Sequence, residues 1–341
     1  MPAIQAADIA DLVTGTLQDL GERKWTDLTT DLQNFFVLPQ LIKKGAVMFR
    51  SGYGLRRNIM IDKNGNVSWV GLYNEDVVSQ ADYMQTMDVP FRHMTANWAL
   101  DEHEVSMNSG PRQLVDLLEE REQACLAAIA ENLEGKFFNE VDDTTVDPWG
   151  LPHWVVKNNT EGFNGGNPTG YSNVGGFTHA RWKNYTGQYT AVDKLSLIPM
   201  MRKAAYKTNF KSPVQMPSYS TGDQRRYLTN YAVSAEMESI LESQNDNLGN
   251  SVNSKDGMVM FQRRPLEVVS YLDDDTTNPV YGINMGTFKT VILKGWNLKR
   301  KTKSTYERQH NVAVTFYDLS CNWYTTNRRD HFVLALNTGG V

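Results

Sequence analysis

The feature that most restricts the fold of this chain is a hairpin signal inside a polar segment. Two apolar runs, at 58–61 and 67–70, flank Asn64 and Gly65, and Asn-Gly is the dipeptide that most readily forms a type I′ turn. The residues on either side are too polar to form a core around such a hairpin, and an isolated two-stranded hairpin is marginally stable in water. We therefore predict an extended β-hairpin loop over residues 46–85 that lies on another surface.

Residues 1–45 are a second segment that needs a partner surface. Apolar residues recur at helical spacing over residues 4–20, with acidic and amide side chains on the other side. A second short helix follows Thr26 and stops before Pro39. We predict a two-helix N-terminal arm, and its apolar stripe includes Ile9, Leu12 and Leu17.

A long strand and a long helix are predicted after the loop. Apolar and polar residues alternate from Asp88 to Met107, which is too long for one typical strand and indicates a long strand or a kinked pair. Pro111 in the first turn then opens the clearest helix of the sequence, and Gly135 is expected to end it. The apolar face of this helix needs a core to cover, and its polar face carries Glu119 and Glu122.

The second half of the chain mixes helices and strands without regular alternation. A Gly-rich segment at 162–176 is taken as a domain boundary. Helices are predicted at 197–207 and 231–243, and strands are predicted at 257–262, 266–272, 288–293, 311–317 and 331–335. The fold class is therefore α+β, and no internal repeat is visible.

Composition argues against several classes of protein. Over 341 residues the formal net charge is -5 and the charges are spread along the chain, so sequence-specific nucleic-acid binding is not expected. The N-terminus lacks the pattern of a secretory signal, and no apolar run reaches the length needed to cross a bilayer. Cys125 and Cys321 lie far apart, so neither a disulfide scaffold nor a metal cluster is predicted.

Three segments contain residue types that are common in catalytic or ligand sites. We interpret Asp101-Glu102-His103-Glu104 as a solvated strand end, because a strand sends neighbouring side chains to opposite faces. The run Asp273-Asp274-Asp275 lacks the Gly and the distal Glu of an EF-hand loop and is interpreted as a charged turn. The segment 162–170 has no Lys followed by Ser or Thr, as a phosphate-binding loop requires. No catalytic residue, cofactor site or metal site is predicted.

The order of these parts resembles that of the major capsid proteins of tailed phages, which have the Hong Kong 97 fold. In that family an N-terminal arm, an extended hairpin loop, a long strand with a spine helix, and an axial domain follow one another. The segment Trp98–Glu104, followed by Asn108 and the helix, is similar to the strand-to-helix entry of these proteins. So is Tyr317–Trp323 leading into Asn327–His331. The resemblance covers essentially the whole chain and rests on the order of its parts.

The resemblance implies an α+β, Hong Kong 97-like fold in four parts. These parts are an N-terminal arm (1–45), an extended loop (46–85), a peripheral domain (86–145 and 255–310) and an axial domain (146–254 and 311–341). The loop would lie across an adjacent subunit, and the arm would reach a further one. Expected contacts between subunits are made by Ile9, Leu12, Leu17, Arg56, Arg57, Asn64, Gly65, Trp69, Glu119 and Glu122.

The same resemblance implies a structural role without enzymatic activity. Copies of the chain are expected to assemble into pentamers and hexamers of an icosahedral phage head that encloses double-stranded DNA, which is bound non-specifically. Expected partners are other copies of the chain, a separate scaffolding protein, a portal and a decoration or cement protein, and no membrane. The expected location is the capsid shell of the virion, assembled in the host cytoplasm.

Two alternatives remain open at this point. An encapsulin-type compartment shares the fold and packages a cargo enzyme in place of nucleic acid. A monomeric carbohydrate-binding protein or enzyme is the alternative of a different class, and it is suggested by the 8 Trp and 15 Tyr residues.

Overall fold

The computed structural model describes residues 47–60, 66–67, 69–72, 84–107, 111–141, 146–166, 180–209, 225–245, 259–262, 264–303 and 311–337. The predicted N-terminal arm lies outside these residues, and with it Ile9, Leu12 and Leu17. Asn64 and Gly65, at the expected turn of the hairpin loop, lie outside them as well.

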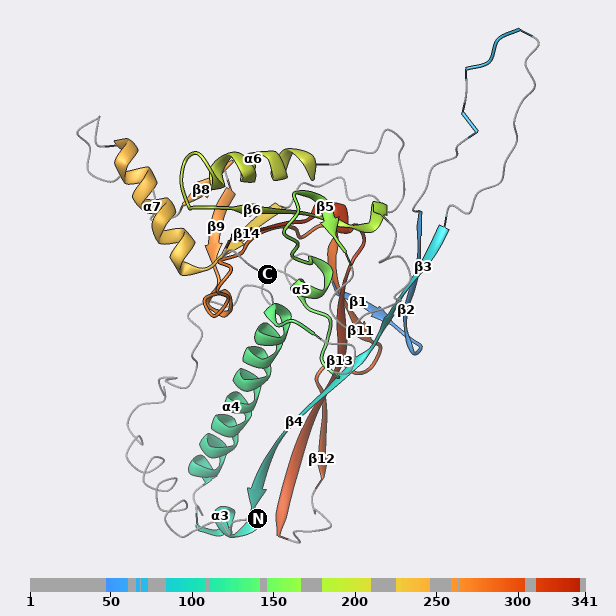
Figure 1. Cartoon of the computed structure of the whole chain (residues 1–341). Helices are drawn as coiled ribbons and strands as arrows, with labels where there is room; N and C mark the ends of the chain where they lie inside the picture. Colours follow the sequence, from blue (N-terminus) through green and yellow to red (C-terminus); the bar gives the residue numbers. More distant parts are fainter. Residues whose placement is uncertain are drawn as a thin grey trace.

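The described residues form two large sheets, a two-stranded hairpin and helices that pack on them (Figure 1). The five-stranded sheet has the order β1 (Val47–Arg50), β11 (Phe288–Leu293), β13 (Val312–Thr325), β12 (Lys299–Lys303), with β4 (Arg92–Asp101) paired to β13. The seven-stranded sheet has the order β5 (Gly162–Gly165), β6 (Asn184–Tyr189), β14 (Phe332–Leu336), β10 (Val280–Asn284), β7 (Arg225–Thr229), β9 (Arg264–Val268), β8 (Met260–Phe261). The hairpin pairs β2 (Gly54–Met60) with β3 (Met84–Pro90). The helices are α3 (Glu102–Met107), α4 (Pro111–Phe138), α5 (Leu151–Trp154), α6 (Leu197–Lys207) and α7 (Tyr231–Asn245), with 3-10 turns η1 (Ala180–Trp182), η3 (Ser270–Leu272) and η4 (Arg328–Asp330).

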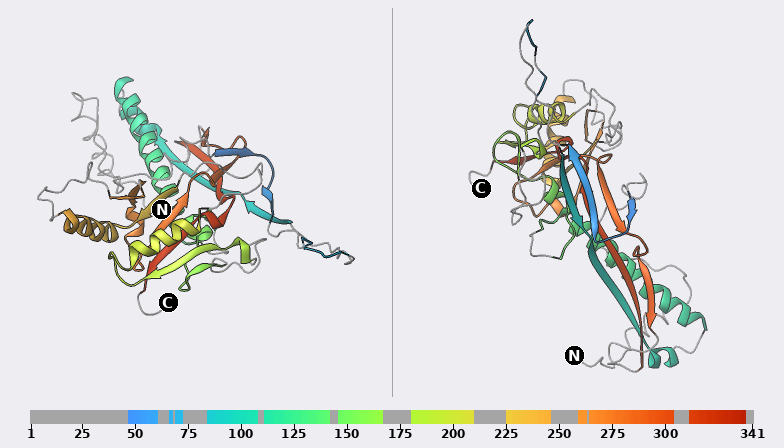
Figure 2. Two further views of the ribbon diagram at one scale, coloured as in Figure 1. Left: turned by 90° about the horizontal axis from the view of Figure 1, so that it is seen from above. Right: turned by 90° about the vertical axis from the view of Figure 1, so that its right-hand side faces the viewer.

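The molecule is elongated and has three visible parts (Figures 1 and 2). The seven-stranded sheet with α6 and α7 forms the upper part in Figure 1. Strands β4, β13 and β12 run downward with α4 beside them, and we call this part the leg. The β2–β3 hairpin extends away from the body toward residues 66–72 at its far end, and we call this part the projection.

The leg is built on the strand pair β4 and β13. These strands are antiparallel and stay in register from Val312 opposite Asp101 to Cys321 opposite Arg92. Side chains along β4 alternate between half-buried and exposed, as expected for a strand with one covered face. The alternation predicted from Asp88 onward therefore corresponds to a kinked pair, since β3 and β4 are separated at Phe91. Strand β4 ends at Asp101, and helix α3 begins at Glu102. The prediction that residues 101–104 are the end of a strand is therefore correct for Asp101 and wrong for residues 102–104.

The long helix α4 runs further than the sequence indicates. It spans 28 residues, about 42 Å at 1.5 Å per residue. It includes Pro111 in its first turn as predicted, but it passes Gly135 and ends at Phe138, because Phe137 and Phe138 are buried in the core. A Cβ atom at Gly135 would lie 3.2 Å from the ring of Tyr271. This glycine therefore permits close packing inside the helix, and the prediction that it ends the helix is wrong.

The seven-stranded sheet is the middle of three layers. On β14, Phe332 and Leu334 face a core completed by α6 and α7, while Val333 between them faces a second core completed by α5 and the end of α4. This second core also contains Phe288 and Trp323 of the five-stranded sheet, so the two sheets share one interior. The helices predicted at 197–207 and 231–243 are confirmed as α6 and α7.

The strands of the second half are found at or near their predicted places. The strand at 288–293 is confirmed at both ends as β11. The run at 266–272 divides into β9 and the turn η3, and the run at 311–317 continues as β13 to Thr325. The runs at 257–262 and 331–335 contain β8 and most of β14. The α+β class is therefore confirmed.

The two sheets do not follow the predicted limits of the domains. Strands β9 and β10 lie within 255–310, a range assigned to the peripheral domain, and they join the seven-stranded sheet. Strand β13 lies within 311–341, a range assigned to the axial domain, and it pairs with β4 in the leg. The four-part division of the chain itself stays a prediction.

The predicted pairing of the two apolar runs on either side of Asn64-Gly65 is wrong. Strand β2 pairs with β3 along its whole length, and the residues described between 66 and 72 belong to no strand. Burial explains this pairing, because Met87 and Val89 of β3 join Leu55 of β2 in the core. A distant partner strand that reaches the core therefore outweighs the local turn signal.

Candidate functional site

The base of the projection is anchored in the body, and its outer face is polar. Leu55, Met87 and Val89 are buried. On the opposite face, Arg56 and Asp88 are cross-strand partners, and Arg56 Nε donates to Asp88 Oδ1 at 2.8 Å. Both side chains of this pair are mostly exposed, so the ion pair contributes little to stability. The pair leaves the outer face of the projection available for contact with another surface.

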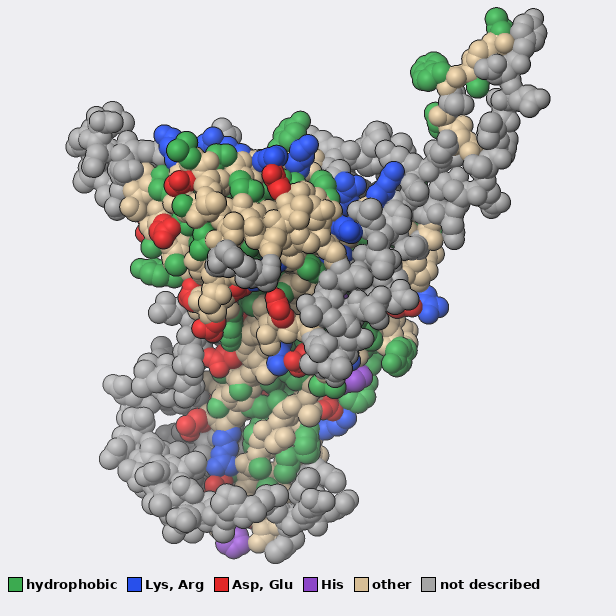
Figure 3. All heavy atoms as spheres, viewed as in Figure 1, with side chains coloured by type: hydrophobic (Ala, Val, Ile, Leu, Met, Phe, Trp, Pro, Cys, Tyr) green, Lys and Arg blue, Asp and Glu red, His purple; other side chains and the backbone are tan. Residues whose placement is uncertain are grey.

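The far end of the projection exposes a group of apolar side chains, which we call the apolar tip. Trp69 is fully exposed at 105 % of its reference area, and Leu72 is 91 % exposed. Figure 3 shows hydrophobic side chains at this far end, away from the body. The group consists of Val67, Trp69, Val70 and Leu72. Burying a large apolar side chain stabilises a protein by roughly 1.5–3 kcal/mol, so these residues favour contact with a partner.

A pocket of about 480 Å³ lies where the projection meets β1. Three arginines line it together with apolar and hydroxyl groups, and the lining consists of Met48, Arg50, Ser51, Gly54, Leu55, Arg56, Arg57 and Tyr324. A Cβ at Gly54 would lie 2.5 Å from the carbonyl oxygen of Val89, so only glycine permits this close approach of the strands. Guanidinium groups recognise carboxylates and phosphates, so the pocket is suited to an anionic group.

Tyr324 is a fully buried residue of this pocket's lining. Its hydroxyl donates to Met48 Sδ at 2.8 Å. Burial raises the pKa of Tyr324, and the positive charges of Arg57 and Arg50 partly oppose that increase. The structure thus brings Arg56 and Arg57, both predicted contact residues, to one pocket. The segment 69–72, which contains Trp69, lies at the far end of the projection (Figure 1).

The two predicted contact residues on α4 differ in their surroundings. Glu119 is exposed on the leg. Glu122 is half-buried and accepts hydrogen bonds from the hydroxyl of Tyr317 and from Arg300 Nη1, the latter at 3.3 Å. Burial and then the hydrogen bond to Glu122 raise the pKa of Tyr317. Glu122 therefore connects α4 to β13 and β12 within one chain, and its contact with another subunit stays a prediction.

A buried arginine that the sequence reading missed holds three segments together. Arg328 in η4 is fully buried, and its guanidinium donates to the carbonyl oxygens of Trp154 at 2.7 Å and Trp182 at 3.0 Å. It also donates to the carbonyl of Gly166 at 3.0 Å and to Asn184 Oδ1 at 3.2 Å. Burial lowers the pKa of Arg328 to about 9. In the sequence, the adjacent charges of Arg328, Arg329 and Asp330 suggest no more than pairing with one another, because sequence alone does not reveal burial.

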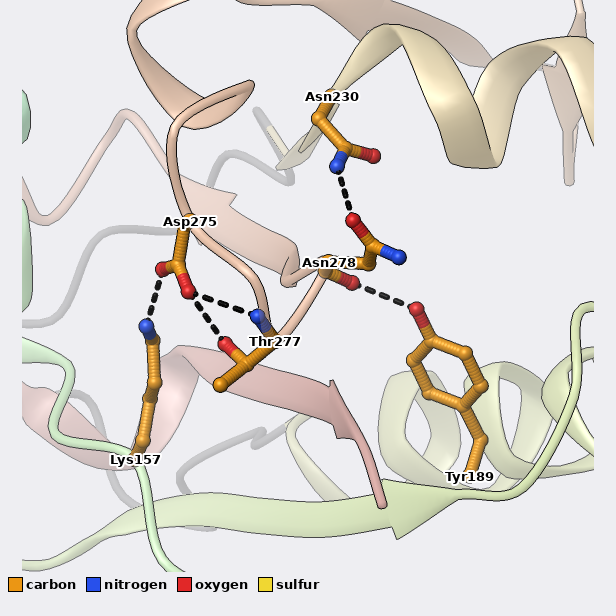
Figure 4. A network of polar contacts seen from close by, with 6 residues as sticks. All are labelled: Lys157, Tyr189, Asn230, Asp275, Thr277 and Asn278. Carbon is orange, nitrogen blue, oxygen red and sulfur yellow. Dashed lines mark hydrogen bonds and ion pairs between the residues drawn. The ribbon is translucent and has the colours of Figure 1, made fainter. Parts of the chain in front are cut away.

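The run Asp273–Asp275, interpreted from the sequence as a charged turn, makes contacts within the chain (Figure 4). Asp275 accepts from Lys157 and from the backbone and hydroxyl of Thr277. Burial opposes ionisation of Asp275, but the hydrogen bonds from Lys157 and Thr277 outweigh it and lower the pKa. Asp273 Oδ1 accepts from the backbone N–H of Tyr231 at 2.8 Å at the start of α7.

The same network attaches the turn before β10 to its neighbours. Asn230 Nδ2 donates to Asn278 Oδ1 at 2.6 Å, and the Tyr189 hydroxyl donates to the Asn278 carbonyl at 2.6 Å (Figure 4). Asn278 has a φ of 43°, a left-handed conformation that asparagine tolerates better than most residues. The contacts in this region therefore fix the position of α7 relative to the seven-stranded sheet.

The segment Asp101–Glu104, whose residue types are common in metal sites, also makes contacts within the chain. His103 Nδ1 lies 3.3 Å from Asp101 Oδ1, and Glu104 pairs with Arg121 at 2.9 Å. In the described part of the chain, no group of three or more His, Cys, Asp or Glu residues is arranged to hold a metal ion. Nor do the described residues include a helix that is both long and apolar enough to span a membrane.

Comparisons with known proteins find relatives only at the level of structure. No family model and no curated protein sequence matches the chain. The capsid asymmetric unit of cyanophage A-1(L) superimposes with a TM-score of 0.64 and 10% identity, covering 93% of this chain and 97% of that one. The capsid of a native GTA particle gives a TM-score of 0.57 and 9% identity, covering 98% and 99%. The SrpI encapsulin complex from Synechococcus elongatus PCC 7942 gives 0.51 and 11%, covering 98% and 96%.

These superpositions span nearly the whole of this chain and nearly the whole of each related chain. They confirm the expected α+β, Hong Kong 97-like fold, and they confirm the resemblance to phage capsid proteins as a likeness of fold. The structures that share this fold are shell proteins, named as capsids and as an encapsulin.

Proposed function

We propose that this chain is the major subunit of a phage-type capsid shell and that it has no enzymatic role. The observation that carries the proposal is the projection, whose apolar tip exposes Trp69 and Leu72 far from any described surface of the same chain. A second copy can cover this tip. The likeness of fold to capsid chains over nearly the full length supports the same function.

In the proposed shell, the chain closes rings of five and six copies. Closed symmetry buries each exposed surface against another copy, so modest contacts add up over the whole particle. The seven-stranded sheet with α6 and α7 is the proposed axial part around the ring centre, and the leg with β4, β13 and α4 is the proposed peripheral part. The N-terminal arm would reach a further subunit, with Ile9, Leu12 and Leu17 as contacts.

The proposed content of the shell is double-stranded DNA held without sequence preference. The exposed basic strand β12 supports a weak contact with phosphates. Its charges are partly neutralised, since Lys301 pairs with Asp318 at 2.7 Å and Arg300 with Glu122. Such a surface binds nucleic acid weakly and with strong salt dependence. A separate scaffolding protein, a portal and a decoration protein are the further proposed partners, with assembly in the host cytoplasm and the virion as final location.

The apolar tip provides a direct test of the proposal. We expect the triple variant Val67→Ser, Trp69→Ser, Leu72→Ser to fold normally, because these side chains are exposed and lie outside any strand. We expect this variant to stay as soluble capsomers or to form aberrant particles, because it loses several kcal/mol of apolar burial per contact. Negative-stain electron microscopy and size-exclusion chromatography measure the outcome.

A matched control shows whether assembly depends on the tip itself or on the general loss of any exposed apolar side chain. Val146→Ser removes an exposed apolar side chain elsewhere on the molecule and should leave shells unchanged. Normal shells from the triple variant would show that the tip is not an assembly contact and would remove the observation that carries this proposal.

A second candidate is an encapsulin-type compartment, which the likeness to the SrpI encapsulin complex favours. Both candidates predict closed shells, and they differ in content. The absorbance ratio of purified particles at 260 and 280 nm, followed by gel analysis, distinguishes nucleic acid from a cargo protein. A monomeric carbohydrate-binding protein or enzyme is the remaining alternative, and a single chromatographic peak at 38.7 kDa would support it.

A further inference from the structure

The helices α6 and α7 carry opposite charge on the same face of the seven-stranded sheet. The sequence of α6 (LIPMMRKAAYK) has three basic residues and no acidic ones. The sequence of α7 (YAVSAEMESILESQN) has three glutamates and no basic residue. Both helices bury apolar residues in the same core, including Met201 of α6 and Met237 of α7. Their polar faces therefore point away from the sheet, and each presents charge of a single sign.

These charged faces form two different sides of the upper part of the molecule. In Figure 1, α6 lies along the top and α7 along the left edge, and the view from above in Figure 2 also separates them. Figure 3 shows Lys and Arg side chains gathered along the top over α6, and Asp and Glu side chains down the left side. The basic and acidic faces thus belong to different flanks of one chain.

The exposed residues on the two flanks have the composition of an interface. Arg202 and Tyr206 are one helical turn apart on α6, and Tyr206 is 81 % exposed. Tyr231 and Glu238 are two turns apart on α7, and Tyr231 is 69 % exposed. Tyr and Arg are enriched at the energetic centres of protein interfaces. Each flank therefore combines an exposed tyrosine with charge of one sign.

Most of the described charged side chains on α6 and α7 form no ion pair with other described residues of the chain. Lys203 pairs with Glu161 at 2.6 Å, so the charge of this lysine is already matched within the chain. Within the described part of the chain, no ion pair involves Arg202 or Lys207 on α6, or Glu236 or Glu238 on α7. These four exposed residues are available to a partner.

We propose that the α6 flank of one copy docks on the α7 flank of the next copy in each ring. This proposal rests on the proposed shell function and names the contact that closes the rings. Charge complementarity selects this arrangement, because a two-fold contact would place like charges opposite each other on either flank. A head-to-tail contact places Arg202, on the same side of α6 as Tyr206, opposite Glu238, on the same side of α7 as Tyr231. Lys207 and Glu236 project from other sides of their helices and add to the charge around this contact. The opposite charges therefore favour rings over two-fold dimers and fix the direction of ring growth.

Charge reversal on one flank at a time tests this contact. We expect the α6 variant (Arg202→Glu, Lys207→Glu) and the α7 variant (Glu236→Lys, Glu238→Lys) to keep the circular dichroism spectrum and melting temperature of the wild type. Each variant alone should need a roughly tenfold or higher protein concentration to assemble, because every contact would then join like charges. The quadruple variant, which carries all four substitutions, should assemble as the wild type does, because its flanks are again complementary.

A mixture of the two reversed chains gives a sharper readout. In an equimolar mixture, the acidic α6 flank of one variant meets the basic α7 flank of the other, so complementary contacts form only when the two chains alternate. Alternation closes rings with an even number of copies and cannot close a ring of five. We therefore expect six-membered rings, and tubes or sheets made of them, without closed shells. Native mass spectrometry and electron microscopy count the copies in each ring.

The controls separate failure of this contact from failure of the proposed function. The variant Lys294→Glu reverses an exposed charge directly after β11, outside both helices, and should form normal shells. Normal shells from either single-flank variant would overturn the α6–α7 contact while the shell function stands. A wild-type chain that remains monomeric would overturn both.

Discussion

At the scale of single residues, the interior depends on buried polar groups whose hydrogen-bond partners come from distant parts of the chain. The fully buried Arg328 donates to carbonyl oxygens from three separate segments. His331 is also fully buried, and both of its ring nitrogens have hydrogen-bond partners. His331 Nδ1 accepts from the backbone N–H of Asn284 at 3.1 Å, and Nε2 lies 2.8 Å from the hydroxyl of Thr325. The ring must therefore be neutral, with its proton on Nε2.

Removing the Arg328 guanidinium is expected to be strongly destabilising. In Arg328→Ala, several buried carbonyl groups lose their donor, so we expect the free energy of unfolding to fall by about 3 kcal/mol or more. Arg328→Lys keeps the charge but offers fewer donors, and its loss should be smaller. The control Arg329→Ala removes a guanidinium 4.3 Å from the ring of Phe163 and should cost about 1 kcal/mol. Urea denaturation of unassembled chain measures the three values, and equal losses for both alanine variants would contradict the role of Arg328.

The pH dependence of stability is expected to follow from His331. Burial, then the charges of Arg225 and Arg328, lower its pKa from 6.5 to about 3. As the pH falls, the unfolded chain takes up this proton before the folded chain does. The stabilisation is therefore complete above pH 6.5 and is lost progressively as the pH falls from 6.5 toward 3.

The variant His331→Gln tests this assignment. It should lower stability at neutral pH, and it should reduce the slope of unfolding free energy against pH in the acid window by up to about 1.4 kcal/mol per pH unit. The variant His103→Gln, which removes an exposed histidine, serves as the control for the substitution itself. A His331→Gln slope equal to that of the wild type would rule out this histidine as the source. His153, whose pKa is lowered by burial to about 3, should account for part of the remaining slope.

At the scale of elements, packing decides where the helices and strands end. Gly135 is a residue that usually ends or weakens a helix, yet α4 passes through it because Phe137 and Phe138 are buried beyond it. The hydroxyl of Tyr271 donates to the carbonyl of Glu131 at 3.2 Å and holds the ring against this glycine. The glycine thus keeps α4 close to η3, at the junction of the leg with the upper part.

A double-mutant cycle tests this packing. In an exposed helix, Gly→Ala stabilises by roughly 0.5–1 kcal/mol. In the wild type we expect no such gain from Gly135→Ala, because the new methyl group meets the Tyr271 ring. In the Tyr271→Ala background the gain should reappear. Thermal or urea unfolding of the four chains measures the coupling, and a full gain in the wild-type background would show that the ring does not constrain this position.

Helices and strands can be predicted from the sequence where their local apolar pattern matches the partners they have in the tertiary structure. Helices α6 and α7 and strand β11 have periodic apolar faces, and their limits were predicted closely. Strands β6 and β7, NYTGQY and RRYLT, were missed because their buried positions hold polar and aromatic residues. Their burial depends on neighbouring strands that lie far away in sequence.

At the scale of the whole molecule, the surface offers side chains for contact with other copies, but it disfavours the addition of strands to the edge of a sheet. Strand β12 lies at one end of the described five-stranded sheet and has the sequence KRKTK. Repeated lysines on an edge strand disfavour addition of a further strand. The chain can therefore expose an apolar tip and two charged flanks for ordered contacts while its basic edge resists uncontrolled association.

The sequence by itself determined the α+β class, the long helix after Pro111 and the presence of an extended loop before it, because these depend on local periodicity and turn residues. Only the tertiary structure decided that β2 pairs with β3, that α4 continues to Phe138, and that Arg56 and Arg57 share a pocket. The physical reason is the same in each case. Burial and close packing join residues that are distant in the chain, and the free energy of those contacts outweighs local preference.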